Sequence, residues 1–280
     1  MTRAHLVNGK VGVEARREWL RGCLEEIYRK YNKRAYVSPD PLEFLYHFTD
    51  PKDQEIVGVV CATLAYGRVE TIVKKVAQAL APLGKTPRET LLSLSSRDLE
   101  SMYNGFKHRF HTGQDMARLL WNMKGLILEY DSLGESLRHF LDITKGDLLG
   151  GLGHFVDALT KDARGRFLFP DPRKGSASKR LFLYLRWMVR CDEVDPGCWK
   201  GLVSPGAILV PLDTHLYSIG RHLGFTKRKS ADLRAATEIT QAFKEIEPED
   251  PVKYDFCLTR FGINPDFSKE DLFCLLERYS

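Results

Sequence analysis

Apolar residues recur at intervals of three and four along most of this 280-residue sequence, which is the spacing of amphipathic helices. Residues 54–66 are apolar on most sides and are expected to form a buried central helix. A glycine-rich stretch, 146–153, is interpreted as a linker or as the start of the next helix. Strand-like alternation is nearly absent, and residues 207–210 are the one short candidate. The sequence therefore predicts an all-α fold, with helices at 14–31, 42–48, 54–66, 69–83, 114–130, 133–142, 155–160, 179–190, 214–223, 231–246 and 251–261.

The composition is typical of a folded protein outside the membrane. Apolar residues make up 43% of the sequence and charged residues 28%, without long runs of one charge, which argues against global disorder. No apolar run approaches the roughly 20 residues needed to cross a bilayer, and the N-terminal residues do not resemble a signal peptide. We therefore expect a soluble cytoplasmic protein without a membrane partner.

Positive charge is concentrated in one part of the chain. The net charge is +5, yet residues 160–190 alone hold nine Lys or Arg against two acidic residues. Such a segment is typical of a phosphate-binding surface, although a solvated helix face would have the same composition. A second cluster, 102–110, mixes aromatic and basic residues, which suits nucleic acid but is equally consistent with a helical core.

Two helix starts are the strongest candidates for a site. The turn Gly-Ser-Ala-Ser (175–178) precedes Lys179, which begins a run without Gly or Pro. Asp213 follows an extended X-Pro segment and precedes a periodic run that ends at Gly224, so it is expected to cap that second helix. Capping alone explains an aspartate at this position, and a lysine at a helix start is usually solvated.

The residues around these two helix starts resemble a known family. The run Pro-Leu-Asp-Thr-His-Leu (211–216) and the later Arg-His-Leu-Gly-Phe (221–225) resemble the catalytic-aspartate segment of the helix-hairpin-helix DNA glycosylases. Ser-Lys-Arg-Leu (178–181) is similar to the segment that carries the Schiff-base lysine of bifunctional members. The resemblance is clear over about residues 175–262 and weak over 40–130, and it points to a bacterial branch of the superfamily.

The sequence departs from the family pattern in two places. The family's apolar-Pro-Gly-apolar-Gly hairpin is replaced by Pro-Arg-Lys-Gly-Ser (172–176). Lys179 and Asp213 are 34 positions apart, a longer separation than in most members and similar to that of the archaeal 8-oxoguanine glycosylases. The connector 192–206, which accounts for the extra length, contains three acidic residues but no metal-binding loop of the EF-hand kind. We expect it to be a surface loop.

The resemblance implies a two-lobed helical fold with an active-site cleft between the lobes. It divides the chain into an N-terminal extension (1–35), a lobe that carries the turn inserted into DNA (36–165), and a lobe that carries Lys179 and Asp213 (166–280). The implied activity is removal of a damaged base, with oxidised guanine as the leading candidate, and strand cleavage at the resulting abasic site (AP lyase). Lys179 would be the nucleophile and Asp213 its electrostatic partner. Two alternatives stay open, a glycosylase in which Asp213 activates water and a helical protein that binds nucleic acid without catalysis.

The same resemblance assigns roles to other residues. The DNA backbone is expected to contact Arg173, Lys174, Gly175, Ser176, Ser178, Arg180, Lys227 and Arg228. The base pocket or the inserted wedge is expected to involve Tyr66, Arg68, Tyr184, Trp187 and His215. The alternatives are core packing for Tyr184 and Trp187, a structural role for His215, and a surface position for Arg68 after a helix end at Gly67. The implied partner is double-stranded DNA with a damaged base or an abasic site. We expect a monomer that associates with the nucleoid when it is bound to DNA.

Cofactor sites are not predicted. Some glycosylases of this superfamily hold an iron–sulfur cluster on four closely spaced cysteines. Cys191 and Cys198 have a similar first spacing, but Cys257 and Cys274 have sixteen residues between them and cannot complete that motif. The six scattered cysteines are therefore expected to be free thiols, with no cluster and no metal.

Overall fold

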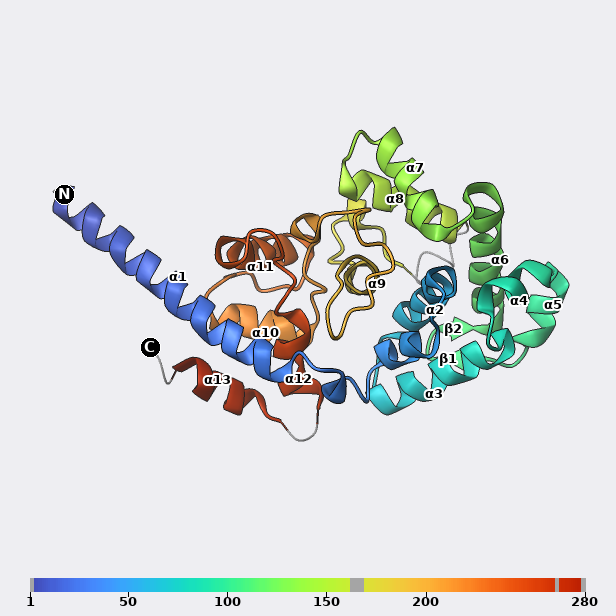
Figure 1. Ribbon diagram of the computed structural model, residues 1–280, viewed down its shortest axis with the longest axis horizontal. Helices are drawn as coiled ribbons and strands as arrows, with labels where there is room; N and C mark the ends of the chain where they lie inside the picture. Colours follow the sequence, from blue (N-terminus) through green and yellow to red (C-terminus); the bar gives the residue numbers. More distant parts are fainter. Residues whose placement is uncertain (1–2, 162–168, 265–266, 278–280) are drawn as a thin grey trace.

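The computed structural model describes residues 3–161, 169–264 and 267–277. It is mostly helical over these residues, which confirms the all-α class (Figure 1). The α-helices are α1 (Arg3–Tyr31), α2 (Pro51–Leu64), α3 (Val69–Leu80), α4 (Pro87–Ser93), α5 (Ser96–Met102), α6 (Gly113–Tyr130), α7 (Leu133–Ile143), α8 (Leu148–Leu159), α9 (Lys179–Val189), α10 (Thr214–His222), α11 (Leu233–Ile246), α12 (Asp255–Ile263) and α13 (Lys269–Glu277). A two-residue hairpin joins β1 (Lys107–His108) to β2 (His111–Thr112). Short 3₁₀ turns are Arg34–Tyr36, Pro41–His47, Ala81–Leu83, Pro172–Lys174 and Pro205–Ala207.

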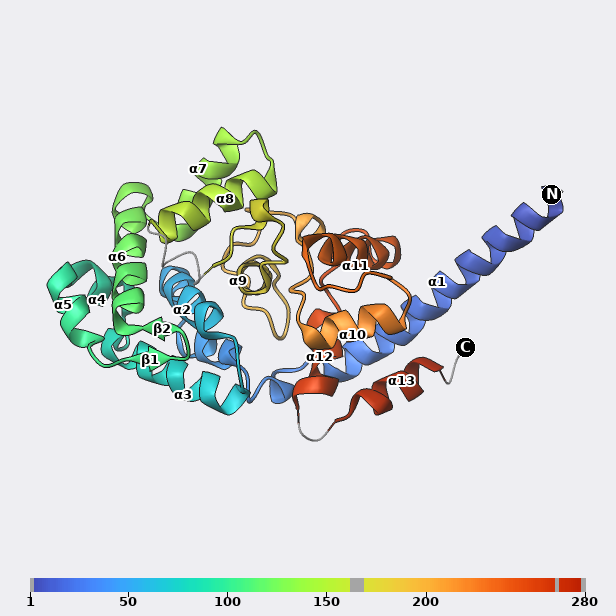
Figure 2. The ribbon, with the colours of Figure 1, turned by 180° about the vertical axis from the view of Figure 1, so that it is seen from behind.

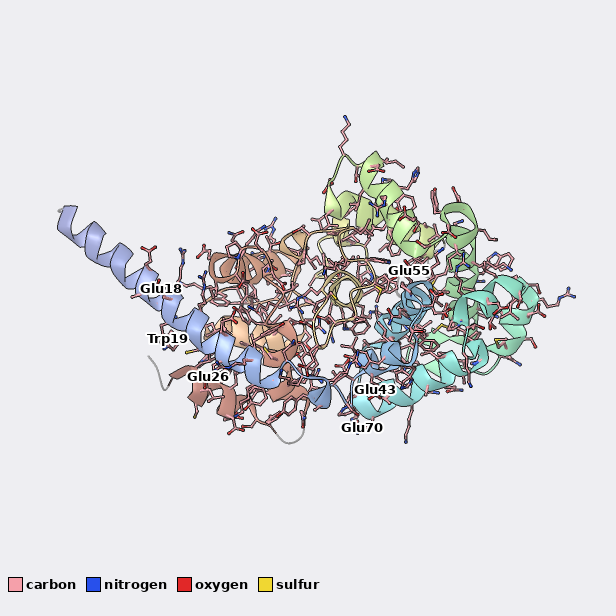
Figure 3. The ribbon with its side chains drawn as sticks, viewed as in Figure 1. Glu18, Trp19, Glu26, Glu43, Glu55 and Glu70 are labelled. Atoms are coloured by element: carbon pink, nitrogen blue, oxygen red, sulfur yellow. The ribbon has the colours of Figure 1, made fainter. Side chains whose placement is uncertain are left out.

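Helix α2 lies at the centre of the core and packs against α9 (Figures 1 and 2). Gly58 permits the close approach, because a Cβ at this position would lie 2.9 Å from side-chain atoms of Tyr184 and Met188. Figure 3 labels Glu55 on α2. The Glu55 carboxylate accepts hydrogen bonds from two backbone N–H groups at the start of α7 and from the Trp199 indole. A buried carboxylate with three donors is well satisfied, so α2 holds α7, α9 and the connector in fixed positions.

The connector 192–206 is not the surface loop that its composition suggests. Asp195 is fully buried and accepts hydrogen bonds from Arg186 and Arg190 of the α9 segment. Arg190 also forms an ion pair with Asp250, at 2.9 Å. Buried charges are tolerated only when they are paired and hydrogen-bonded, and here each carboxylate has a guanidinium beside it. Asp195 of the connector therefore belongs to the core, whereas Glu193 is exposed and pairs with Lys33 at 2.8 Å.

The C-terminal half of helix α1 packs against α11, α12 and α13, while its N-terminal turns project away from the other helices (Figure 1). Leu24 and Ile27 of α1 are buried, and Glu25 forms an ion pair with Lys253, at 2.6 Å. The N-terminal helix thus joins the C-terminal part of the chain in space (Figure 1). The predicted boundary between residues 165 and 166 lies outside the described residues.

Other expectations need correction. The segment 42–48, predicted as an α-helix, lies in a 3₁₀ turn. Residues 207–210, predicted as a strand, form none; the 3₁₀ turn Pro205–Ala207 ends there, and Ile208 after it is extended. Helix α8 begins inside the glycine-rich stretch, where the Asp147 carboxylate caps it, so this stretch is the start of the helix and not a linker. Across the described part of the chain, no helix is long and apolar enough to cross a membrane.

Candidate functional site

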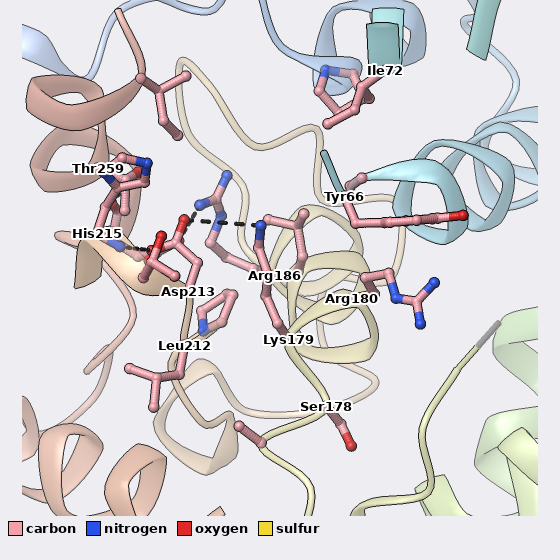
Figure 4. Close-up of a pocket in the computed structure, with 18 of the residues that line it drawn as sticks. Tyr66, Ile72, Ser178, Lys179, Arg180, Arg186, Leu212, Asp213, His215 and Thr259 are labelled. Carbon is pink, nitrogen blue, oxygen red and sulfur yellow. Dashed lines mark hydrogen bonds and ion pairs between the residues drawn. The ribbon is translucent and has the colours of Figure 1, made fainter. Parts of the chain in front are cut away.

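A cavity of about 560 Å³ opens where the turn after α2 faces the starts of α9, α10 and α12 (Figure 4). Its walls come from two separate parts of the sequence, one before residue 73 and one after residue 169. Lys179, Asp213 and His215 all line it, together with Tyr66 and Asp255. The fold therefore brings together residues that the sequence analysis selected in two separate stretches.

The start of α9 presents Lys179 to the cavity. Ser178 has a left-handed φ of 43°, and its hydroxyl donates to the Pro170 carbonyl at 2.7 Å instead of capping the helix. The preceding turn is held by the Ser176 hydroxyl, which accepts from the Ser178 backbone N–H at 3.1 Å. No side chain of the described residues caps α9, which leaves backbone N–H groups of its first turn without a capping partner. Lys179 lines the cavity together with Ser176 and Ser178.

Asp213 has two roles, one for each carboxylate oxygen. Oδ1 accepts hydrogen bonds from the backbone N–H groups of His215 at 2.9 Å and Leu216 at 2.8 Å, which confirms the predicted cap of α10. Oδ2 lies 3.8 Å from Nζ of Lys179 (Figure 4). The Asp213 side chain is 11% exposed and that of Lys179 is 36% exposed. Capping fixes the carboxylate rigidly and leaves one oxygen for chemistry beside the amine.

A second carboxylate lies deeper in the cavity wall. Asp255, at the start of α12, accepts a hydrogen bond from the Arg186 guanidinium through Oδ2. Its buried Oδ1 has no hydrogen-bond partner among the residues the structure describes. Burial raises the pKa of the Asp255 carboxyl to about 6, Arg186 opposes this rise, and the charge of Asp213 adds to it. The sequence analysis assigned no role to Asp255 or Arg186, since nothing in the sequence distinguishes them from other charged helix residues.

The His215 imidazole lies against α12. Its buried Nδ1 has no hydrogen-bond partner within the described ranges, and a Cβ added at Gly262 would lie only 2.0 Å from that atom. Burial lowers the pKa of His215; Asp213 opposes this, while Lys269, Lys179 and Arg260 lower it further. His215 is therefore a neutral ring at neutral pH, and the glycine in α12 provides the space for it.

We expect Gly262→Ala to displace the His215 ring and to destabilise the protein by about 1–3 kcal/mol, because a methyl group would overlap the imidazole. The measurement is the free energy of unfolding in urea for Gly262→Ala, His215→Ala and the double variant. The cost of the alanine should be much smaller when His215 is absent, which a double-mutant cycle reports as coupling. Equal costs in the two backgrounds would contradict this contact.

Tyr66 forms the opposite side of the cavity. Its hydroxyl donates to the His108 carbonyl at 2.6 Å and lies 2.7 Å from Nδ1 of His111. Its ring lies 5.1 Å from the Arg180 guanidinium. Arg68, the other residue predicted in this turn, begins α3 with an exposed side chain and does not line the cavity.

Several basic residues predicted to contact DNA have intramolecular partners instead. Arg173 forms ion pairs with Asp157 at 2.6 Å and Asp171 at 2.9 Å, and Arg228 forms a bidentate pair with Asp232. These contacts hold both guanidinium groups against neighbouring carboxylates.

Other predicted contacts differ in exposure. Arg180 is half-buried, donates to the Thr63 carbonyl at 3.0 Å, and has a pKa lowered to about 10 by burial. Lys174, Gly175 and Lys227 are exposed. Arg164 and Arg166, which belong to the basic segment 160–190, lie outside the described residues.

Tyr184 and Trp187 do not line the cavity. Both are fully buried, and Tyr184 packs its ring 5.0 Å from that of Trp199. Their expected place in a base pocket is corrected to a place in the core, because both side chains are fully buried and Tyr184 packs against Gly58 of α2. Within residues 3–161, 169–264 and 267–277, no group of three His, Cys, Asp or Glu side chains could hold a metal ion, and the six cysteines are free thiols.

Comparison with known proteins adds a family but no activity. A family model described as "Protein of unknown function (DUF2400)" matches residues 40–264. Because this match covers most of the chain, the protein belongs to that family. Searches of curated proteins and of solved structures found no match.

Proposed function

We propose that this DUF2400 family member is a base-excision DNA glycosylase that also cleaves the strand at the abasic site through a lysine Schiff base. The observation that carries the proposal is the pair of Lys179 Nζ and Asp213 Oδ2, 3.8 Å apart in a cavity of about 560 Å³. A cavity of this size can hold one nucleotide extruded from a duplex. In this proposal the fold is the two-lobed one of the helix-hairpin-helix glycosylases, and the cavity is the cleft between the lobes.

The proposed reaction begins with the bond between C1′ of the sugar and the base nitrogen. As this bond breaks, positive charge develops on the sugar, and the fixed carboxylate of Asp213 stabilises it. The departing base keeps the bonding electrons and takes up a proton. The neutral amine of Lys179 forms the new bond to C1′, and Asp213 accepts the proton that the amine releases.

Strand cleavage follows from the covalent intermediate. Opening of the sugar ring converts the C1′–N bond into a protonated Schiff base, which acidifies the hydrogens on C2′. Loss of one such proton expels the 3′-phosphate by β-elimination, so the strand is cut without an oxidant or reductant. Water then hydrolyses the Schiff base and releases Lys179.

DNA would reach this site through contacts to its backbone. The uncapped start of α9, with Ser176 and the exposed Lys174 beside it, offers N–H donors and positive charge suited to a phosphate group. Lys227 offers a more distant positive charge. Oxidised guanine is the first substrate to test, a choice that rests on the 34-residue separation of Lys179 and Asp213.

One observation favours an alternative. The Lys179 amine and the Asp213 carboxylate form an ion pair at 3.8 Å, whereas attack on C1′ needs an amine with a free electron pair. If the ion pair persists in the complex with DNA, Asp213 would activate water and Lys179 would only hold charge, which describes a glycosylase without lyase activity.

Trapping with borohydride tests the proposal. The protein is incubated with a duplex that contains one abasic site, with and without borohydride, and separated under denaturing conditions. We expect a covalent protein–DNA adduct with borohydride and a cut strand without it. Release of 8-oxoguanine from a lesion duplex without any adduct would favour the water-using glycosylase. DNA binding with neither activity would contradict both enzymatic readings and leave a protein that only binds nucleic acid.

A further inference from the structure

A short hairpin from a distant part of the sequence is fixed to the edge of the cavity. β1 and β2 pair in a register that places Arg109 and Phe110 at the tip. Tyr66, which lines the cavity, holds both strands, because its hydroxyl contacts His108 and His111 while its carbonyl oxygen lies 3.1 Å from Nε2 of His108. Both histidines are buried, so the hairpin is anchored rather than loosely attached.

The hairpin tip carries an exposed ring. Phe110 is 71% exposed, the highest value among the large apolar side chains that the structure describes as exposed. Arg109 has a φ of 51°, a left-handed conformation that usually belongs to Gly, Asn or Asp in tight turns. A hairpin without function would favour a small polar residue here. The chain instead holds Arg109 in this unfavourable conformation, with the bulky Phe110 beside it.

Four side chains form a row, called the ladder here, that runs from the exposed Phe110 through Arg109 and Tyr66 to Arg180 at the cavity. The Arg109 guanidinium lies 5.7 Å from the Phe110 ring and 5.8 Å from the Tyr66 ring. The Arg180 guanidinium lies 5.1 Å from the same Tyr66 ring, next to Lys179 in sequence. Arg109 also covers the turn after α2, since a Cβ at Gly67 would lie 3.4 Å from its guanidinium. Rings alternate with cations along the whole ladder.

We propose that Phe110, supported by Arg109, stacks on an unpaired nucleobase next to the nucleotide that enters the cavity. Alternating aromatic rings and guanidinium groups are the surface on which bases of single-stranded or distorted nucleic acid stack, because every base has a π face. An extruded nucleotide leaves such a face open at its neighbour. This inference rests on the proposed function and moves the inserted element from the turn at Tyr66 and Arg68 to the hairpin tip.

Binding to a duplex with a tetrahydrofuran site, a stable abasic analogue that cannot react with an amine, tests this inference. We expect Phe110→Ala to weaken binding to this duplex by about tenfold, as loss of one stacked base predicts. Phe110→Trp should bind within about twofold of the parent, and an intact duplex should show little difference among the variants, because it offers no open base face.

Trp121→Ala is the matched control. Trp121 is also exposed, at 43%, and also lies under a cation, with Lys124 5.5 Å from its ring, but it belongs to α6 and is not part of the row of Arg109, Tyr66 and Arg180 that leads to the cavity. It should bind like the parent. A 2-aminopurine placed beside the tetrahydrofuran site should change fluorescence on binding to the parent and to Phe110→Trp, and much less on binding to Phe110→Ala.

Two results would overturn the inference in different ways. If Phe110→Ala binds as well as the parent and gives the same 2-aminopurine signal, the stacking role is wrong. The proposed glycosylase activity is then still tested separately by borohydride trapping. If the parent binds none of the duplexes, the stacking role and the proposed function are both wrong. Phe110 is exposed, so its replacement is not expected to affect folding, which thermal unfolding would verify.

Discussion

Replacing Lys179 with glutamine is expected to abolish the borohydride-trapped adduct and to lower strand cleavage at abasic sites by at least about 10³-fold. An amide nitrogen is not a nucleophile and cannot form a Schiff base. Glutamine keeps a side chain of similar reach and its N–H donors, so it can still contact Asp213, and DNA binding should change only a few-fold. The measurements are adduct formation and single-turnover cleavage of an abasic duplex.

Lys200→Gln is the control for the lost charge. Lys200 is an exposed lysine of the connector that does not line the cavity, so this variant should trap and cleave like the parent. An adduct that persists in Lys179→Gln would place the nucleophile on another residue and contradict the proposed role of α9. Loss of the adduct in both variants would indicate that general positive charge, rather than the Lys179 amine, limits the reaction.

Asp213→Asn should separate the two roles of this carboxylate. The amide oxygen can still accept the N–H groups of His215 and Leu216, so the free energy of unfolding should stay within about 0.5 kcal/mol of the parent. The negative charge that faces Lys179 is lost, and base release should fall on the order of 10³-fold. Asp213→Ala should show the same catalytic loss and lose a further ~1 kcal/mol of stability with the cap.

Asp147 provides the matched capping control. Its carboxylate caps α8 through the Leu149 backbone N–H at 3.2 Å, and it does not line the cavity. Asp147→Ala should therefore lower stability about as much as the lost cap of α10 and leave base release unchanged. Urea unfolding and single-turnover base release measure the two effects. If Asp213→Asn releases base at the parental rate, Asp213 is only a helix cap.

The helices that carry the candidate pair could be predicted from sequence because their signals are local. The run from Lys179 has helical periodicity without Gly or Pro, and Asp213 stands between an extended X-Pro segment and a periodic run. Both helices begin at the predicted residues, and the cap at Asp213 is confirmed. Local patterns do not contain the distance between the two helices, and only the family resemblance suggested that these two residues meet.

The errors concern features that depend on distant partners. An acidic connector is typical of a surface loop, and only the position of Arg186 and Arg190 on the buried side of α9 makes Asp195 a core residue. Arg173 belongs to a basic segment, yet acidic residues of another helix and of its own turn neutralise it. The hairpin has strands of two residues, too short for any alternation to appear in the sequence. Helices α4, α5 and α13 were not predicted, and they are only seven to nine residues long.

The buried pairing of Arg186 with Asp195 and Asp255 has a consequence for how spacing in this chain should be interpreted. The 33 residues between Lys179 and Asp213 do not act as a flexible linker whose length sets how far apart the two side chains lie. Arg186 holds the connector on one side and the start of α12 on the other, and α12 in turn packs against α10. The distance between Lys179 and Asp213 is thus set by buried contacts in the interior of the protein. Shortening the connector would remove the buried partner Asp195 of Arg186 rather than only shorten a surface loop.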